Sequence, residues 1–404
     1  MMATPDRNRP VVDGQMRQAA LACIDKLMTR QDAGQTAASP LRALTHIASA
    51  LAEDDTHDQV WIVDADKAAE LLPNHGANRK KGAEPLPSAI ATWFRATPSY
   101  ERPLLYRLHS PTLRGVLTAG VEAMGMKAPH GGDVAGRGIF LNDAAVSSRD
   151  RQQRVRPELP LWLAAQPTWL PYDPASAQEL QALLCAALDA LYVRGESGFC
   201  YLSAHDEPSA GASPLSQKEA SDAFRGMYRL RALPDTKPPY AIRLCGAGSA
   251  LASVLEAARW LQLDWGVACE VWSCPSYTRL AREAAALEHM VLCGADVTGQ
   301  TTHLSRCLAS GHAPVLAVTG YARHIANQIG AFVPARFAAL GSDDTGAGGK
   351  GRTVGVPGVA AMTGMPGDAP GVRWIVLNAL RLLVNDGTLP RTRIADATRR
   401  YGLA

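Results

Sequence analysis

The feature that most constrains the fold is a regular alternation of short apolar runs and amphipathic stretches in the second half of the chain. Each apolar run is followed by a turn residue and, after a short connection, by a stretch with helical periodicity. Such short connections require parallel strands that helices cover on both faces. The pattern predicts strands at 241–245, 269–273, 313–318 and 336–340, and helices at 251–263, 277–287, 321–330 and 374–386.

The first half of the chain repeats this alternation less regularly. Apolar runs of strand type occur at 60–63, 103–108, 139–141 and 199–202, and helical periodicity occurs at 16–29, 39–51 and 175–194. A proline-rich segment at 233–239 separates the two halves and is typical of a linker.

These patterns predict an α/β protein with two doubly wound domains, each built on a mainly parallel sheet. We expect residues 1–38 to form a polar lead-in with one helix, residues 39–235 the first domain and residues 236–404 the second. The first strand of the second domain is expected at Ala241–Cys245. A chain of 404 residues has room for two such domains.

Charge and hydropathy exclude several classes of protein. The 41 Lys and Arg residues against 38 Asp and Glu leave a formal charge of +3, which is too small to indicate nucleic acid as a partner. No apolar run approaches roughly 18 residues, the length that spans a bilayer, and residues 1–35 lack the apolar core of a signal peptide. We therefore expect a cytoplasmic protein with no membrane partner.

The eight cysteines are scattered singly, and none belongs to a Cys-x-x-Cys pair. This spacing favours neither a zinc site nor a disulfide framework. We expect reduced thiols, most of them buried as small apolar side chains, and no metal site within this chain.

Two glycine-rich segments could bind phosphate, and each has a simpler interpretation. Gly246-Ala247-Gly248-Ser249 follows a predicted strand, but Leu251 stands where a dinucleotide fingerprint has its third glycine. A tight strand-to-helix turn is the favoured interpretation. The segment 341–352 lacks phosphate-loop spacing and is better explained as a surface loop. By themselves, the motifs predict no self-sufficient catalytic site.

A set of short strings follows the order found in one known enzyme family. The most specific is residues 131–142, similar to a family run G-G-T-S-G-R-T-T-L-N with one residue inserted. The others are Tyr172 to Ala175, Met227 to Leu230, Leu244 to Ser249, Val271 to Arg282, Phe332 to Pro334 and Leu340 to Asp343. From about residue 39 onward, about nine-tenths of the chain, this set resembles the homodimeric pyruvate dehydrogenase E1 component family of the transketolase superfamily.

The resemblance implies a domain composition and a cofactor. Family members have three consecutive domains, which bind diphosphate with Mg²⁺, bind the aminopyrimidine ring, and form a C-terminal domain. This chain resembles a pyrimidine-binding domain followed by a transketolase C-terminal domain. The G-D-G motif that begins the family's metal-binding site does not occur in these 404 residues. Thiamine diphosphate would therefore be held only with a partner chain, whose site would also supply the Mg²⁺.

At two positions the chain departs from the family's active-site motifs. Aligning Trp93 and Ser99-Tyr100 with the family pattern places Leu86 where a glutamate activates the cofactor ring. Leucine cannot exchange a proton, so Glu84, two residues away, is the best remaining candidate for a catalytic contact. Ser148 stands where the resemblance places an active-site histidine, and serine does not titrate near neutral pH.

The resemblance leaves two functions open. In the first, the chain supplies two domains of a pyruvate-type 2-oxoacid dehydrogenase E1 enzyme, with a separate diphosphate-binding subunit and possible contact with a lipoyl acyltransferase complex. In the second, which Leu86 and Ser148 favour, it is a non-catalytic regulatory or assembly subunit. Both predict association, either with that subunit or as a homo-oligomer. We expect the isolated chain to be inactive.

Overall fold

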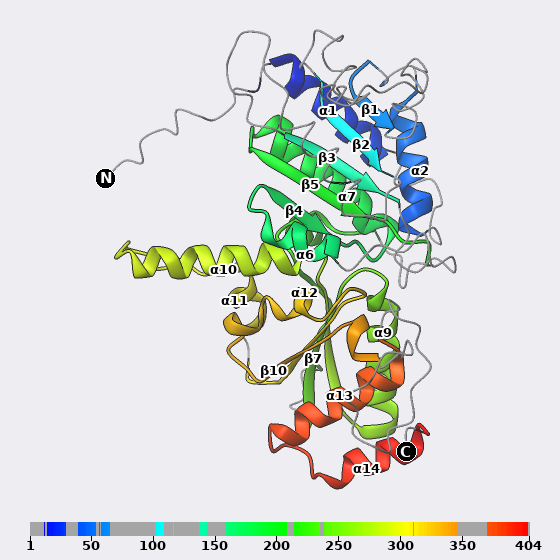
Figure 1. The fold of residues 1–404 in the computed structure, drawn as a ribbon, viewed down its shortest axis with the longest axis vertical. Coiled ribbons are helices and arrows are strands. Elements are labelled where there is room, and N and C mark those ends of the chain that lie inside the picture. The colour runs from blue at the N-terminus through cyan, green and yellow to red at the C-terminus, as the bar shows by residue number, and fades with distance from the viewer. Residues whose placement is uncertain are drawn as a thin grey trace, which may run out of the picture.

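Two five-stranded sheets, one above the other along the long axis of the molecule, organise the computed structural model (Figure 1). The structure describes residues 14–29, 39–53, 58–64, 102–108, 137–143, 158–207, 214–234, 238–309, 311–345 and 370–402, with the single residues 12, 56 and 116. Strands of the first sheet end by residue 203, and those of the second begin at residue 228.

All neighbouring strands of the first sheet are parallel, in the order β1-β2-β3-β5-β4. They are β1 (Trp61–Asp64), β2 (Leu104–Leu108), β3 (Arg137–Asn142), β4 (Trp169–Tyr172) and β5 (Gly198–Ser203). The four apolar runs predicted in this half fall on β1, β2, β3 and β5. Because the strands are parallel, their carboxyl ends lie along one edge of the sheet.

Helices cover one face of this sheet. They are α1 (Gly14–Thr29), α2 (Pro40–Leu51) and α7 (Ala177–Leu188), which continues into the π-helix η3 (Asp189–Val193). Leu105, Ile139 and Leu202 of the strands share a buried core with these helices. Helix α7 begins later than predicted because the Ser176 side chain accepts a hydrogen bond from the Glu179 N–H, at 3.1 Å, and so caps the helix.

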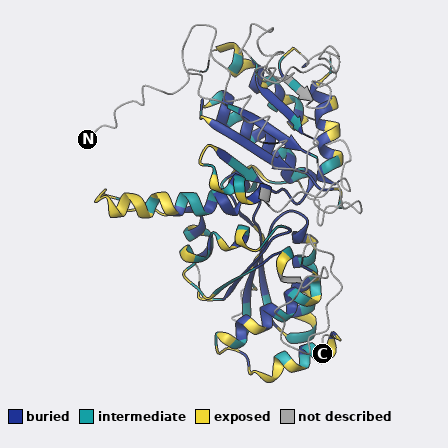
Figure 2. Ribbon diagram, viewed as in Figure 1, coloured by how far each residue is buried: buried dark blue, intermediate teal, exposed yellow. Residues whose placement is uncertain are grey.

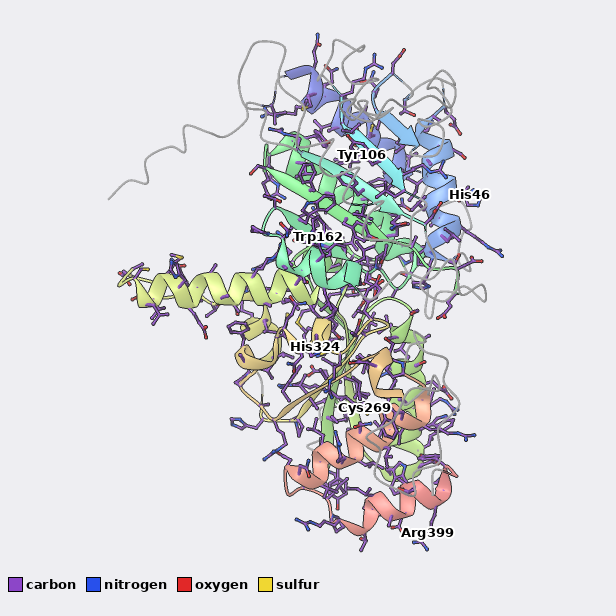
Figure 3. All side chains as sticks on the ribbon, in the orientation of Figure 1. His46, Tyr106, Trp162, Cys269, His324 and Arg399 are labelled. Carbon is purple, nitrogen blue, oxygen red and sulfur yellow. The ribbon has the colours of Figure 1, made fainter. Side chains whose placement is uncertain are left out.

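The opposite face of the first sheet is aromatic. The Tyr106 and Phe140 rings are stacked with their centroids 4.6 Å apart, and Trp169 tilts against Phe140 at the same distance. Trp162 of helix α6 (Glu158–Ala165) meets Trp169 edge-on at 5.6 Å (Figure 3). Both faces of the sheet are therefore buried, as in a doubly wound fold.

The second sheet has the order β10-β9-β7-β8-β6. Its strands are β6 (Tyr228–Arg231), β7 (Ala241–Gly246), β8 (Ala268–Ser273), β9 (Val315–Val318) and β10 (Phe337–Leu340). All pairs are parallel except β6 with β8, which is antiparallel.

Helices pack on both faces of the second sheet. One buried core contains residues of α9 (Ala250–Trp265), α13 (Val372–Asn385) and α14 (Thr392–Arg400), and another contains residues of α10 (Tyr277–Leu292), α11 (His303–Leu308) and α12 (His324–Asn327). The remaining helices are α8 (Gln217–Phe224), η4 (Gly330–Phe332) and η5 (Ser342–Thr345). The predicted fold class, two doubly wound and mainly parallel sheets, is confirmed.

Strand β6 bears on how the chain divides into domains. It precedes the proline-rich segment, yet it pairs with β8, so the second sheet starts at Tyr228 and not at Ala241–Cys245 as expected. We propose a domain boundary near residue 226 in place of the boundary at 235. The sequence pattern missed this strand because only Tyr228 of its four residues is buried, as is usual for an edge strand.

Two further elements differ from the expectations. Strand β4 was not predicted, because Pro171 interrupts its apolar pattern. The helix predicted at 321–330 is only the short α12, followed by the 3₁₀ turn η4.

The outer surface shows one projecting element. The second half of α10 extends away from the body of the protein and is mostly exposed, and Leu292 at its end is 84% exposed (Figures 1 and 2).

All eight cysteines are free, and six of them are buried, as the sequence predicted. Among the helices that the structure describes, none combines the length and apolarity needed to cross a bilayer.

Candidate functional site

The two halves of the chain meet through the carboxyl ends of their strands, the edge at which α/β proteins bind ligands. Asp173, directly after β4, lies against the turns that follow β7 and β8. Its backbone N–H donates to the Pro275 carbonyl at 2.7 Å, and its own carbonyl accepts from the Gly248 N–H at 2.9 Å. Both backbone polar groups of Asp173 therefore join the first half to the second.

The Asp173 carboxylate is buried at this junction, with 9% of the residue exposed. The Ser203 hydroxyl, at the end of β5, donates to Oδ1 at 2.7 Å. Burial raises the pKa of Asp173 to about 7; the Ser203 hydrogen bond opposes this rise, and the charge of Glu179 adds to it. The carboxyl can therefore exchange a proton near neutral pH, which makes it a candidate for chemistry or for control of the junction.

The Gly246-Ala247-Gly248 turn accommodates this carboxylate. Gly248 has φ +50°, and a Cβ placed there would lie 2.2 Å from Oδ2 of Asp173. Only glycine allows both the left-handed backbone and the close approach of the acid. The Asp173 side chain from the other half of the protein therefore occupies the glycine-rich turn that could have bound phosphate.

Glu179, in the first turn of α7, is the second buried carboxylate at the junction and is fully buried. Its Oε2 accepts from the Ala175 N–H at 2.5 Å, and its Oε1 accepts from the Ser273 hydroxyl of β8 at 2.6 Å. Burial raises the pKa of Glu179, while these hydrogen bonds and one with Tyr228 lower it. Among the residues that the structure describes, hydroxyl and backbone donors satisfy this acid.

Two arginines of α10 fasten that helix to the first half. Arg279 lies over the Phe224 ring, with its guanidinium carbon 4.3 Å from the centroid, and donates to the Tyr172 hydroxyl at 2.7 Å. Arg282 donates to backbone carbonyls at and beyond the end of α6, including Ala164 at 2.9 Å. These contacts fasten the second half of the protein to the first half.

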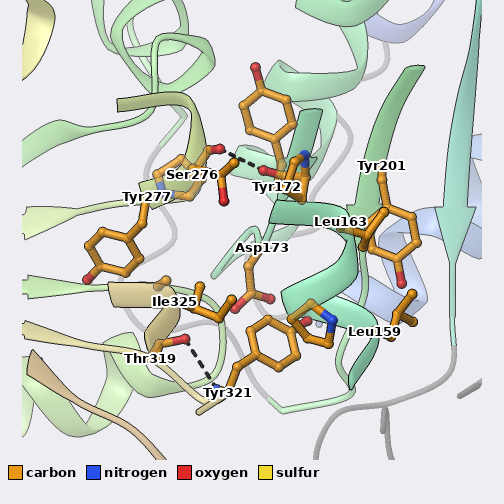
Figure 4. A pocket seen from close by; sticks show the side chains of 15 residues that line it. Leu159, Leu163, Tyr172, Asp173, Tyr201, Ser276, Tyr277, Thr319, Tyr321 and Ile325 are labelled. Carbon is orange, nitrogen blue, oxygen red and sulfur yellow. Dashed lines mark hydrogen bonds between the residues drawn. The ribbon is translucent and has the colours of Figure 1, made fainter. Parts of the chain in front are cut away.

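A small cavity opens beside Asp173 (Figure 4). It has a volume of about 40 Å³ and lies between both halves of the chain. Its lining residues are Leu159, Pro160, Leu163, Pro171, Tyr172, Asp173, Tyr201, Ala247, Pro275, Ser276, Tyr277, Thr278, Thr319, Tyr321 and Ile325. A space of this size holds water molecules, since one water needs roughly 10–15 Å³.

His205 is a polar residue at this edge that the motifs did not single out. It lies two residues beyond β5 and is 2% exposed, and neither ring nitrogen makes a well-formed hydrogen bond. Burial lowers the pKa of His205 to about 4, against the opposing effects of the Pro174 carbonyl and Asp206. The imidazole is therefore neutral at pH 7. The sequence signal that could have identified His205 is its position directly after a buried strand.

Comparisons with known proteins support this architecture. Residues 226–355 match the family model of the transketolase-like TK C-terminal domain. The chain is 27% identical over 358 residues to the pyruvate dehydrogenase E1 component of Cupriavidus necator, covering 86% of this chain and 37% of that protein. The chain is thus similar to the pyruvate dehydrogenase E1 component over most of its length, and its second half is similar to transketolase C-terminal domains. A second relative of this E1-like chain, the E1 component of Mycolicibacterium smegmatis, is 32% identical over 187 residues, which are 46% of the chain and 20% of that protein.

The fold of the E1-like chain is also that of a solved transketolase. The transketolase from Leishmania mexicana superposes with a TM-score of 0.53 and 14% identity, over 92% of this chain and 50% of that structure. The E1-like chain thus spans well under half the length of these two E1 components.

The predicted site residues of the E1-like chain lie outside the described residues. Glu84 and Leu86 belong to the segment between β1 and β2, and Ser148 belongs to the segment between β3 and α6. Their roles stay predictions. The described strand ends bring together Asp173, Ser203 and His205 in their place.

The described part of the E1-like chain does not fit thiamine diphosphate with its metal. Within the described residues, no group of three or more His, Cys, Asp or Glu side chains could hold a metal ion. The cavity at Asp173 admits water but not a molecule with two linked rings and a diphosphate. A complete site for that cofactor therefore needs residues outside the described ones or a partner.

Proposed function

We propose that this chain supplies the pyrimidine-binding and C-terminal halves of a thiamine-diphosphate-dependent, pyruvate-type 2-oxoacid dehydrogenase E1 enzyme. The observation that carries the proposal is the similarity to the E1 component across 86% of the chain, which spans both sheets and the junction between them. A similarity confined to one domain would support a shared module only.

A separate chain would supply the diphosphate-binding domain and Mg²⁺ in this proposal. No G-D-G motif occurs in these 404 residues, so the metal-binding part that the resemblance implies lies outside them. The apolar end of α10, where Met290, Val291 and Leu292 are 39%, 53% and 84% exposed, offers a surface that such a subunit or a second copy would cover. Transfer of the acyl group to a lipoyl acyltransferase complex is the corresponding downstream step.

A cytoplasmic location is part of the same proposal. All eight cysteines are free, and a set of unpaired thiols suits a reducing compartment.

A non-catalytic E1-like subunit is the second candidate. The resemblance places Leu86 at the position of the ring-activating glutamate and Ser148 at that of an active-site histidine. Both replacements remove a group that exchanges protons, and the loss of one general acid or base commonly costs about 10²- to 10⁴-fold in rate. This candidate retains the association surfaces and lacks the chemistry.

Reconstitution distinguishes the two candidates. The chain would be assayed for CO₂ release from pyruvate with thiamine diphosphate and Mg²⁺, alone and with a polypeptide that carries the diphosphate domain of an E1 component. The enzyme proposal expects no activity from the chain alone, no cofactor affinity better than about 1 mM alone, and turnover with the added polypeptide. Complex formation without turnover would support the non-catalytic subunit.

One pair of variants then tests the residue assignment. Glu84→Gln should abolish the reconstituted turnover if Glu84 contacts the cofactor ring. Glu256→Gln, which changes an exposed carboxylate on α9, is the matched control and should leave turnover unchanged. Full activity of Glu84→Gln would remove Glu84 from the site without affecting the fold assignment.

A further inference from the structure

The second half of the chain holds a pocket far from the junction, at the end of the molecule where α14 lies (Figure 1). It is open to solvent, has a volume of about 280 Å³, and has exposed arginines in its walls. Its walls are Trp260 and Asp264 of α9, Arg373 of α13, and Arg400 and Tyr401 at the end of α14. Three helices from separate parts of the sequence thus build it.

The pocket has an excess of positive charge. The single acid, Asp264, is already satisfied, because Oδ1 accepts from Arg400 at 2.5 Å and Oδ2 accepts from the Tyr401 hydroxyl at 2.9 Å. Arg373 makes one hydrogen bond, from Nη1 to the Tyr401 carbonyl at 3.2 Å, and has no acidic partner among the described residues. Its remaining N–H donors are available to a ligand.

The N-terminus of α13 adds to the positive charge of the pocket. Arg373 lies in the first turn of α13, which contains no acidic residue, and Gly371 caps the helix without a side-chain hydrogen bond. A helix N-terminus carries about half a positive charge, so a cation there is unfavourable unless an anion joins it. Arg373, Arg400 and this terminus face the negative charge of Asp264 and the carboxyl ends of α9 and α14, so the pocket keeps a small net positive charge.

One wall of the pocket is aromatic and rigid. The Trp260 and Tyr401 rings are stacked, with centroids 5.3 Å apart and planes inclined by 26°. The Trp260 indole N–H donates to Glu256 at 2.6 Å, and the Tyr401 hydroxyl accepts from the Trp265 N–H at 2.8 Å. Hydrogen bonds therefore fix the rings in place, and they offer a planar surface beside two guanidinium groups.

We propose that this pocket binds a small phosphate monoester with a planar ring, of the nucleoside monophosphate class. The dianionic phosphate would pair with Arg373 and Arg400, whose guanidinium groups match phosphate geometry, and the ring would lie against Trp260. The site lies away from the junction between the two sheets and does not depend on the proposed function.

Calorimetric titration of the full chain tests the proposal with AMP, adenosine and inorganic phosphate as probes. AMP should bind with a dissociation constant below about 1 mM, and adenosine and phosphate should each bind at least about tenfold more weakly. Arg373→Gln should weaken AMP binding at least about tenfold. The matched control is Arg381→Gln, an exposed arginine on the same helix, which should change nothing.

Trp260→Leu gives a second and independent measurement. It keeps an apolar contact and removes the aromatic surface, so the affinity for AMP should fall while the weak affinity for phosphate stays the same. No AMP binding up to about 10 mM would overturn the proposal. Equal affinities for AMP and phosphate, or equal effects of Arg373→Gln and Arg381→Gln, would also overturn it.

Discussion

Ionisable side chains are buried in two regions of the described structure, and a different kind of partner stabilises them in each region. In the centre of the second sheet, Arg243 and Glu270 are 1% and 4% exposed and form an ion pair, with Nε and Oε2 3.0 Å apart. At the junction between the sheets, Asp173 and Glu179 are buried among hydroxyl and backbone donors instead. The first region pairs an acid with an arginine, whereas in the second region burial raises the pKa of both carboxyls.

The ion pair has a structural role, whereas we expect the stability of the junction to depend on pH. The Arg243 guanidinium also donates to the Leu308 carbonyl at 3.1 Å, so this arginine joins the ion pair to the end of α11. The junction depends on the protonation of Asp173, whose pKa burial raises to about 7. The edge at which α/β proteins bind ligands is thus also the pH-dependent part of this fold.

The largest expected effect comes from breaking the ion pair. Arg243→Met leaves Glu270 buried, with the exposed Arg229 at 3.4 Å as its remaining cationic partner among the described residues, so the free energy of unfolding should fall by about 3–5 kcal/mol. Urea denaturation followed by circular dichroism measures the loss. Adding Glu270→Leu should recover part of it, because no unpaired charge then stays buried.

An exposed pair provides the control for this experiment. Arg399→Ala removes the contact between Arg399 and Asp396, 2.6 Å apart on the surface of α14, and should cost less than about 1 kcal/mol. Equal losses for Arg243→Met and Arg399→Ala would contradict the structural role of the buried pair.

The next effect concerns pH at the junction. The pKa of Asp173 is raised to about 7 from an unfolded value of about 4, so its contribution to stability is full below about pH 4 and is lost as pH rises through about 7. Asp173→Asn stays neutral at every pH. The free energy of unfolding of the wild type, minus that of the variant, should therefore fall by roughly 3–4 kcal/mol from pH 4 to pH 8.

Urea titrations of both proteins at a series of pH values give this difference directly. Asp396→Asn, at an exposed position, should show no such trend and serves as the control. Parallel curves for the wild type and Asp173→Asn would show that the junction does not respond to pH.

A smaller effect tests the contact between Gly248 and Asp173. Gly248→Ala and Gly266→Ala both force alanine into a left-handed backbone, with φ +50° and +65°, at a cost of about 1 kcal/mol each. At Gly266 a Cβ meets nothing within 4 Å, whereas at Gly248 it meets the Asp173 carboxylate. Gly248→Ala should therefore cost about 1–2 kcal/mol more in unfolding free energy.

The double variant Gly248→Ala/Asp173→Ala decides whether the carboxylate is the cause. It should be less destabilised than the two single losses added together, because the clash disappears with the acid. Additive losses would show that the turn tolerates a side chain and that Asp173 moves aside.

The smallest effect is expected for the arginine that joins α10 to α6. Arg282→Lys keeps the charge, but a lysine cannot direct planar donors at several carbonyls, so the loss should be about 1–2 kcal/mol in unfolding free energy. Arg306→Lys changes an exposed arginine on α11 and should cost less than about 0.5 kcal/mol. Losses of equal size for the two variants would contradict the role given to Arg282.

The central strands and the main helices were predictable from local sequence. The run at 241–245 became β7, and the apolar residues Leu180, Leu183, Leu184, Ala187, Leu188 and Leu191 of the helix after Pro174 are all buried. A strand that is covered on both faces needs a continuous apolar run, and a covering helix needs one apolar side. Both requirements act within a few residues, so they are visible before folding.

Two of the four edge strands were not predictable in the same way, whereas the apolar runs of β1 and β10 were predicted. Strands β4 and β6 lie at the edges of their sheets, and β6 has three exposed residues of four. What makes such a segment a strand is the neighbouring strand with which it pairs, and that neighbour is distant in the sequence.

For the candidate site, sequence by itself determined the components, and only the tertiary structure determined their association. The strings around Asp173 and Gly248 are each visible as family motifs, and the glycines indicate a tight turn. No local sequence pattern indicates that the Asp173 side chain of the first half enters the turn at Gly248 in the second half. The pKa near 7 arises in the same way, because it depends on burial by segments from both sheets, and desolvation is a property of the packed fold.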